Sequence, residues 1–285
     1  SPAHPVELAS TAIRRQLTAG NRCTQLYWSR DSSQVRFIDR PGAETPVGIW
    51  GIDANQAGAE PELVTDRLAL YSPDGKLIAY PHPSRGTTII ERLADGQTWE
   101  IDAQEERPSF TPDSRQIMWT TFDEDAPRDS RVETIWLANV DGSEVRILLR
   151  ARRTDRVAWL GADRLLMVRR IAGSSDEQLF TLSLTDGSQT DLLLLPEIRG
   201  LSLSPDNRYL LYYVTFEPEA EKNGLWLLDL EAAPLAPQKL PFFGTYRWRD
   251  NDRFIYIPLD PAASEHNFFE YDLTSGQSRP LFPQG

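Results

Sequence analysis

The sequence predicts an all-β fold, a six-bladed β-propeller of four-stranded antiparallel blades, and three observations carry this prediction. One pattern recurs six times: an aromatic residue or Leu, a polar turn with Asp or Asn, then an alternating apolar strand. The copies begin at Trp28, Tyr71, Phe110, Trp159, Leu203 and Trp248. Their starts lie 39 to 49 residues apart, which is the length of a propeller blade. Each copy also continues with further short strand and turn signals.

The first turn of each unit has a physical explanation. In the unit at Tyr71, Pro73 fixes φ, Asp74 can bond to its own backbone, and Gly75 accepts a positive φ. An apolar strand should follow this turn in each unit. The clearest of these second strands are residues 77–80, 116–119, 164–168, 209–212 and 253–256.

A third strand with period-two alternation follows a loop of variable length. It is predicted around residues 136–140, 180–184, 226–230 and 269–273. Asp-Gly or Ser-Gly turns then lead to a more polar fourth strand, as at 97–101, 144–149 and 189–194. One unit departs from the pattern, because Glu91 occupies a core-facing position. Either this strand slips by one residue, or Glu91 is buried and paired.

The repeat divides the chain into an N-terminal extension, residues 1–23, and a propeller, residues 24–285. The expected blades are residues 24–65, 66–103, 104–151, 152–196, 197–242 and 243–285. In the extension, Val6, Ala9, Ile13 and Leu17 recur at helical spacing. This spacing predicts a short helix on the flank of the propeller, and an extra strand at the ring closure is the alternative.

The stretch Ser72–Tyr80, followed by a strand and an Asp-Gly turn, resembles the repeat of TolB-like (WD40-like) propellers. Pro-Asp also stands at 112–113 and 205–206, whereas the units at Trp28, Trp159 and Trp248 lack the Pro. The resemblance implies a periplasmic scaffold, often for protein–protein contact. The same repeat type occurs in the propellers of prolyl-oligopeptidase-like peptidases, so the likeness specifies architecture better than function.

Composition excludes several classes of protein. The 42 acidic and 30 basic side chains give a net charge of −12, which argues against a nucleic-acid partner. One Cys cannot form an internal disulfide, and the longest apolar runs are too short to span a bilayer. The chain begins with Ser, which a removed signal peptide, a membrane anchor outside this segment, or ordinary trimming would explain. We expect an extracytoplasmic location, periplasmic or at the cell surface.

Catalytic motifs are scarce. His4, His82 and His266 lie in three different parts of the chain, which disfavours a histidine zinc site or a Ser-His-Asp triad. No phosphate-binding loop is present, so we expect no cofactor. Cys23 is either a buried inert thiol or a reactive one. A calcium site at Asp123, Asp125 and Asp129 lacks the spacing of a calcium loop, and we expect no metal.

Two sets of charged residues are candidate binding residues. Loops between second and third strands should emerge on one face of the ring and carry an acidic rim. Its proposed members are Asp123, Glu124, Asp125, Glu217, Glu219 and Glu221. Near the start of four innermost strands stand Arg67, Arg107, Arg156 and Arg199.

The four arginines have two interpretations. They are either solvated or paired with nearby acids (Asp66, Glu106, Asp155 and Glu197), or they line a channel mouth that captures a carboxylate through bidentate hydrogen bonds. The function we expect is a non-enzymatic protein- or peptide-binding scaffold of the bacterial cell envelope. Its partner binds at the channel mouth and the loops 122–133 and 216–224, and a carboxylate-bearing segment would suit the arginines. The alternatives are a propeller domain of a larger peptidase or membrane sensor, and a metal-dependent hydrolase or lactonase.

Overall fold

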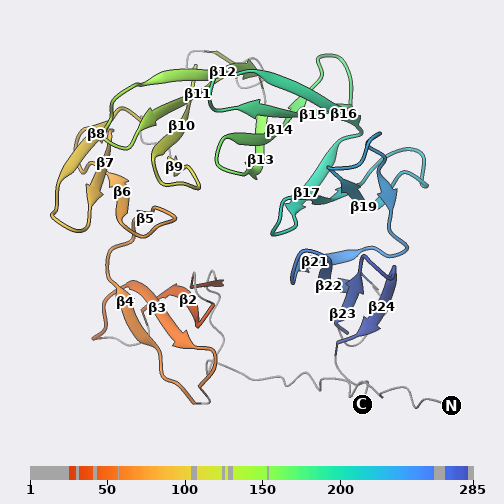
Figure 1. Cartoon of the computed structure of the whole chain (residues 1–285), viewed down its shortest axis with the longest axis horizontal. Coiled ribbons are helices and arrows are strands. Elements are labelled where there is room, and N and C mark those ends of the chain that lie inside the picture. Colours follow the sequence, from red (N-terminus) through yellow and green to blue (C-terminus); the bar gives the residue numbers. More distant parts are fainter. Residues whose placement is uncertain are drawn as a thin grey trace.

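The computed structural model is a ring of six antiparallel sheets, as Figure 1 shows. The structure describes residues 26–29, 32–40, 44–56, 58–103, 108–123, 126–127, 131–152, 154–259 and 267–281, without the side chain of Asp155. Each sheet has four strands, so the predicted all-β, six-bladed propeller is confirmed. The expected helix or strand of the N-terminal extension lies outside the described residues.

The strands follow the chain in order, four to a blade. Blade 1 contains β1 (Leu26–Trp28), β2 (Gln34–Asp39), β3 (Gly48–Asp53) and β4 (Glu62–Thr65). Blade 2 contains β5 (Leu70–Tyr71), β6 (Leu77–Pro81), β7 (Thr88–Arg92) and β8 (Thr98–Ile101). Blade 3 contains β9 (Ser109–Phe110), β10 (Gln116–Phe122), β11 (Val132–Asn139) and β12 (Arg146–Arg152).

The second half of the ring repeats this order. Blade 4 contains β13 (Thr154–Leu160), β14 (Arg164–Arg170), β15 (Glu177–Ser183) and β16 (Gln189–Leu195). Blade 5 contains β17 (Ile198–Leu203), β18 (Tyr209–Val214), β19 (Gly224–Asp229) and β20 (Gln238–Lys239). Blade 6 contains β21 (Gly244–Trp248), β22 (Arg253–Pro258), β23 (Phe269–Asp272) and β24 (Gln277–Pro280).

Every described sheet pairs its strands in sequence order, from the first strand to the fourth. Each blade is therefore built from one continuous segment, and this includes blades 1 and 6, the first and the last along the chain. Figure 1 places the first strand of a blade nearest the centre and the fourth nearest the outside. The first strands are thus the walls of the central channel.

The repeated first turn is held by the hydroxyl that opens it. Ser72 donates to Asp74 at 2.6 Å and accepts the backbone N–H of Leu77 at 2.9 Å. Thr111 and Ser204 make the same two bonds in blades 3 and 5. Blade 1 has no Pro here, yet the hydroxyl of Ser29 also accepts an N–H five residues on, from Gln34, at 2.9 Å. The side-chain bonds therefore define this turn more strictly than the Pro does.

A second hydrogen bond marks the repeat in all six blades. The backbone N–H just beyond the third strand donates to the carbonyl just before the second strand, over 2.8–3.1 Å. Its donors are Ala54, Leu93, Val140, Leu184, Leu230 and Leu273. The six units thus superimpose in register, as the sequence pattern predicts.

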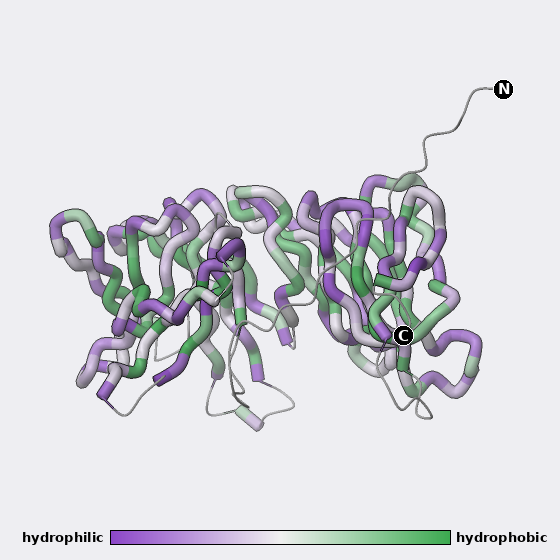
Figure 2. The backbone as a smooth tube through the Cα atoms, turned by 90° about the horizontal axis from the view of Figure 1, so that it is seen from below, coloured by the Kyte–Doolittle hydropathy of each residue, from purple (hydrophilic) through white to green (hydrophobic). Residues whose placement is uncertain are grey.

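The hydrophobic core lies between blades rather than within one. Alternate residues of a strand face the preceding and the following blade, so Ile90 packs with Ile117 of the next blade and both are fully buried. Equivalent clusters join blades 3 and 4, 4 and 5, and 5 and 6. In Figure 2, hydrophobic stretches accordingly follow the strands and hydrophilic stretches the turns. Each buried side chain of this size contributes about 1.5–3 kcal/mol.

Glu91 keeps the register of the repeat and is paired. It lies opposite Ile78 in β6, and its side chain is 15% exposed. Arg67 donates to both carboxylate oxygens, at 2.9 and 2.6 Å, and Tyr80 donates at 2.9 Å. Of the two explanations that the sequence leaves open, the structure shows no slip of the strand and a paired carboxylate, which is partly rather than fully buried.

Within the described residues, the structure contains no helix of the length and apolar character needed to cross a membrane.

Candidate binding site on the loop face

One face of the ring, here called the loop face, gathers the loops between second and third strands and the links between blades. It follows from the up-and-down order of each sheet, because second and fourth strands end on the same side. Examples are the loop 215–223 between β18 and β19 and the link 240–243 between β20 and β21. The predicted acidic and arginine residues that the structure describes belong to segments that begin or end on this face.

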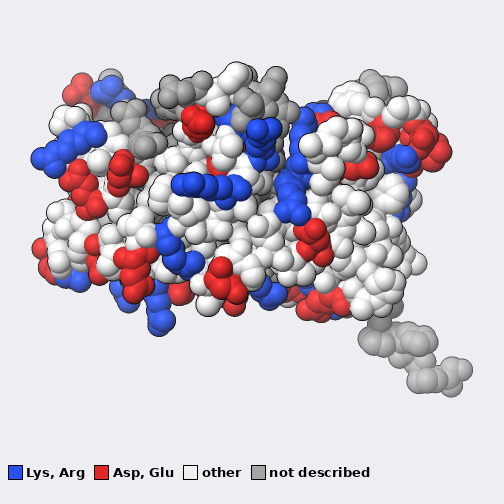
Figure 3. Space-filling view, turned by 90° about the horizontal axis from the view of Figure 1, so that it is seen from above, with Lys and Arg blue, Asp and Glu red and all other residues white. Residues whose placement is uncertain are grey.

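The acidic candidates are only partly described. Asp123 is exposed at the end of β10, whereas Glu124 and Asp125 lie outside the described residues. In the loop 215–223, Glu217 is half-buried, and Glu219 and Glu221 are exposed. Glu219 pairs with Lys222. Seen from the side that carries β12 and β16, the ring shows Lys and Arg interspersed with Asp and Glu (Figure 3).

Arg67 is bound to the blade next to it. Its guanidinium pairs with Glu91 and lies 5.6 Å from the ring centre of Tyr80. The hydrogen bonds from Arg67 and Tyr80 lower the pKa of Glu91, and the same bond raises the pKa of Arg67. The partner is therefore Glu91 rather than the neighbouring Asp66, and this arginine is already neutralised.

Arg199 is also neutralised, here by the expected partner. Its guanidinium lies 2.9 Å from Glu197, which also pairs with Arg170 at 2.8 Å. On its other side Arg199 stacks over the ring of Phe216, 5.5 Å from the ring centre. Arg199 thus connects the channel wall to the loop 215–223.

Arg156 differs from these two arginines. It donates to the hydroxyl of Ser109 in the neighbouring inner strand and lies 5.7 Å from the ring centre of Trp159. No carboxylate partner is found for it in the part of the chain that the structure describes. Solvent reaches the residue, yet partial burial lowers the pKa of its guanidinium. Arg107, the fourth predicted arginine, lies outside the described residues.

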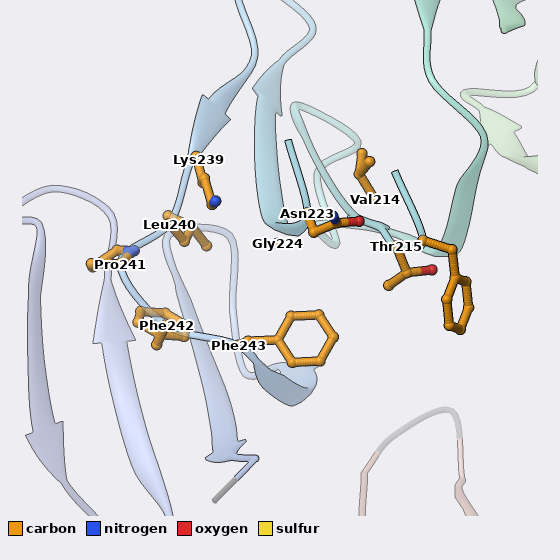
Figure 4. A pocket seen from close by; sticks show the side chains of 10 residues that line it. Val214, Thr215, Asn223, Gly224, Lys239, Leu240, Pro241, Phe242 and Phe243 are labelled. Atoms are coloured by element: carbon orange, nitrogen blue, oxygen red, sulfur yellow. The ribbon is translucent and has the colours of Figure 1, made fainter. Parts of the chain in front are cut away.

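A pocket of about 750 Å³ opens on the loop face between blades 5 and 6. We call it the blade 5–6 pocket, and Figure 4 shows it from close by. Its lining is Val214, Thr215, Phe216, Asn223, Gly224, Lys239, Leu240, Pro241, Phe242 and Phe243. Phe216 is 87% exposed and has a φ of 67°, a left-handed conformation that is uncommon for an aromatic residue.

Aromatic contacts and a loop-closing asparagine support the walls of the pocket. Phe242 stacks on Tyr256 with 3.8 Å between ring centres, and Phe243 meets Tyr213 edge-on at 5.2 Å. Asn223 closes the loop by accepting the N–H of Glu217 and donating to its carbonyl, at 2.9 and 2.8 Å. These contacts fix both sides of the pocket on the sheets of blades 5 and 6, as a preformed site requires.

Two polar groups of the pocket wall have hydrogen-bonding capacity left among the described residues. Lys239 donates from Nζ to the backbone carbonyl of Glu221 at 2.7 Å, and its side chain packs over Gly224. The hydroxyl of Thr215 is shielded from solvent without a hydrogen-bond partner among the described residues. An unpaired buried hydroxyl costs about 1–3 kcal/mol.

Sequence reasoning identified the loop from Phe216 to Gly224 but missed the opposite wall. The signal for that wall is the run Pro241-Phe242-Phe243-Gly244, two aromatic residues in a link between blades where turn residues are usual. Arg247 was missed too, although it is an exposed cation on the inner strand β21. Its position relative to the anchor Trp248 differs from that of the other four arginines.

Of the three histidines and the one thiol, the structure describes only His82. Nδ1 of His82 accepts the N–H of Ser84 at 3.2 Å, and His4, His266 and Cys23 lie outside the described residues. Within the described ranges, no three His, Cys, Asp or Glu residues form a group that could hold a metal ion.

Comparisons with known proteins give matches at the level of structure. No protein-family model and no curated protein sequence matches the chain. An oligogalacturonate lyase in complex with manganese has a TM-score of 0.62 at 12% identity, over 90% of this chain and 75% of the lyase. Dipeptidyl peptidase 4 from Porphyromonas gingivalis has a TM-score of 0.60 at 12% identity. That match covers 96% of this chain and 48% of the peptidase, about half its length.

A putative TolB from Agrobacterium tumefaciens is 16% identical, over 78% of this chain and 84% of that protein, with a TM-score of 0.47. At these identities a structural likeness shows the fold alone. The solved structures that resemble the chain thus include enzymes as well as TolB proteins. The chain is a six-bladed β-propeller whose structural neighbours include TolB.

Proposed function

We propose that the chain is a non-enzymatic scaffold that binds a protein or peptide partner through the loop face. The observation that carries this proposal is the blade 5–6 pocket, an open aromatic-lined site beside an 87% exposed Phe216. Large exposed aromatic residues beside a preformed pocket are typical of binding surfaces. The rigid sheets behind the loops supply the scaffold.

The charges of the loop face support a role in partner choice. Arg156 in the channel wall has neutral contacts only, among the described residues, whereas Arg67 and Arg199 are neutralised by Glu91 and Glu197. A carboxylate of the partner would therefore pair with Arg156 before the other two. Such charges set specificity and association rate more than affinity. We place this function outside the cytoplasm, in the cell envelope, in keeping with the TolB-like repeat.

Site-specific photo-cross-linking tests the proposal. A benzoylphenylalanine is placed at position 216 on the loop face and, as the control, at position 76 on the opposite face, where Lys76 is exposed. Both proteins are irradiated in an envelope extract of the producing cells. We expect one defined cross-linked species from position 216 and none from position 76, and we expect Arg156→Glu to abolish it. Equal cross-linking at both positions, or none at either, contradicts the proposal.

A propeller domain of a larger peptidase is the second candidate. The match to dipeptidyl peptidase 4 favours it, because nearly all of this chain matches about half of that protein. The intact mass of the protein purified from its natural source distinguishes the two candidates. A mass near 32.3 kDa supports the scaffold, and a mass about twice as large supports the peptidase domain.

A further inference from the structure

We infer that the blade 5–6 pocket binds the C-terminal residue of a peptide. This inference rests on the proposed function and specifies its ligand. The apolar side chain of that residue lies between Phe216 and Phe243, and its carboxylate pairs with Lys239. A peptide end joins both features in one residue, an apolar group of variable size and a fixed negative charge.

The apolar half of the ligand follows from the lining. Seven of the ten lining residues have no polar side-chain atom: Val214, Phe216, Gly224, Leu240, Pro241, Phe242 and Phe243. Three of the seven are Phe, and Phe216 on the loop 215–223 and Phe243 on the link 240–243 belong to opposite walls. Figure 4 shows the ring of Phe243 extending from the link toward the wall that carries Val214 and Thr215. The volume, about 750 Å³, exceeds the space that one side chain needs, so residues before the last one also fit.

The charged half of the ligand follows from Lys239. It is the one charged residue among the ten that line the pocket. An ammonium has three donors, and the carbonyl of Glu221 takes one of them. Lys222 on the same loop is different, because Glu219 already neutralises it. Lys239 is therefore the cation that can still pair with a carboxylate, and the unpaired hydroxyl of Thr215 stands in the same lining.

The acidic loop determines what precedes the last residue. Glu217, Glu219 and Glu221 do not line the pocket, but they belong to the loop 215–223, which supplies Thr215, Phe216 and Asn223 to its lining. Glu219 is paired with Lys222, so Glu217 and Glu221 are the charges that repel a peptide with further carboxylates near its end and favour one with neutral or basic residues there. The ligand class is thus a peptide that ends in an apolar residue and is not acidic just before it.

Three acetylated tetrapeptides test this assignment by calorimetric titration. The first is Gly-Lys-Gly-Phe with a free carboxylate, the second is the same sequence as an amide, and the third is Gly-Lys-Gly-Ser with a free carboxylate. We expect the Phe acid to bind at least ten-fold more tightly than the amide, which lacks the charge. We expect the same margin over the Ser acid, which lacks the apolar group.

Matched variants assign the effects to residues. Lys239→Met keeps the side-chain stem over Gly224, and it should bind the Phe acid and the amide equally. Lys222→Met is the control and should keep the full difference, because this lysine is paired outside the pocket. Phe243→Ala should weaken both Phe peptides about ten-fold. A melting temperature within a few degrees of wild type shows that each variant is folded.

The inference is overturned if the amide or the Ser acid binds as well as the Phe acid, or if Lys239→Met keeps the difference. The inference is also overturned if laurate, a fatty acid, binds more tightly than the Phe acid. It is overturned likewise if sedimentation experiments show that a second copy of the chain occupies the pocket. A cross-link from position 216 combined with failure of the peptides leaves the scaffold function standing and removes only this assignment.

Discussion

Glu91 accepts hydrogen bonds from both terminal nitrogens of Arg67, and this pair occupies a position that the other five blades fill with apolar residues. The equivalent residues, two before the repeated backbone donor, are Ile52, Ala138, Leu182, Leu228 and Tyr271, and all are buried. The ion pair therefore joins the link between blades 1 and 2 to the third strand of blade 2, at a position where blades 3 to 6 contribute residues to apolar clusters.

Replacing Glu91 by Ala should destabilise the protein by about 1–2 kcal/mol, because Arg67 and Tyr80 lose a charged hydrogen-bond partner. Solvent weakens this ion pair, because the side chain of Arg67 is 44% exposed. The double replacement Arg67→Met with Glu91→Leu restores the apolar character of the other blades and should cost less than Glu91→Ala alone. Urea unfolding measures all three free energies.

The exposed pair of Arg208 and Glu231 provides the control. Their charges lie 3.6 Å apart, and Glu231 is 71% exposed, so Glu231→Ala should change the free energy of unfolding by less than about 0.5 kcal/mol. If Glu91→Ala changes the free energy of unfolding as little as this control does, the ion pair of Arg67 and Glu91 does not stabilise the ring.

The sequence is informative about the blades because their turns are local. The hydroxyl at Ser204, the carboxylate at Asp206 and the positive φ of Asn207 all lie within one turn, so the spacing of residue types reveals the structure. Ser32 and Ser114 also adopt a positive φ, which residue type alone does not predict. The hydrogen bonds of the turn hold these residues there.

The candidate site is less predictable because its contacts are not local. Arg67 pairs with a residue 24 positions away, and the sequence indicates the neighbouring Asp66 instead. The pocket likewise forms where the link with Phe243 meets the loop with Phe216. Periodicity predicts that both segments reach the same face, but it does not predict that they meet in one pocket.

The buried carboxylate of Glu270 should make stability depend on pH. The side chain is 1% exposed, and Arg249 and Arg279 both pair with it. Burial acts to raise the pKa of Glu270, but the hydrogen bonds from the two arginines outweigh burial and lower it. A lowered pKa means that the ionised form stabilises the fold above the ordinary value of 4.5. This contribution is lost as the pH falls below that value.

We therefore expect Glu270→Gln to reduce the free energy of unfolding at pH 7 by roughly 1.5–3 kcal/mol. The difference from wild type should shrink as the pH falls from about 5 toward the lowered pKa, since the wild type then loses the same charge. Melting curves between pH 3 and 7 measure it. Asp163→Asn, at an exposed pair 3.8 Å from Arg164, should show no such trend. A difference that stays constant over this range contradicts the assignment.

The hydroxyl of Ser204 should contribute more to the free energy of unfolding than the hydroxyls of other serines that bond to an Asp two residues away. It is 1% exposed, donates to Asp206 at 2.5 Å and accepts the N–H of Tyr209 at 2.9 Å. Ser204→Ala leaves that N–H without a partner, and we expect a loss of about 1–3 kcal/mol. Ser188 donates to Asp186 at 2.7 Å in an exposed turn, so Ser188→Ala should cost less than about 0.5 kcal/mol. If urea unfolding gives equal losses of free energy for Ser204→Ala and Ser188→Ala, the buried turn contributes no more to stability than the exposed one.

Arg156 should contribute to binding without contributing to stability. Partial burial lowers the pKa of its guanidinium, and among the described residues its contacts are the neutral Ser109 and Trp159. The charge is therefore held at a cost that a ligand carboxylate would relieve. Because Arg156 is exposed and solvent screens its charge, Arg156→Gln should change the free energy of unfolding by less than about 0.5 kcal/mol. The same substitution should weaken capture of the partner in the cross-linking experiment. A clear loss of stability in urea unfolding would instead assign Arg156 a structural role between blades 3 and 4.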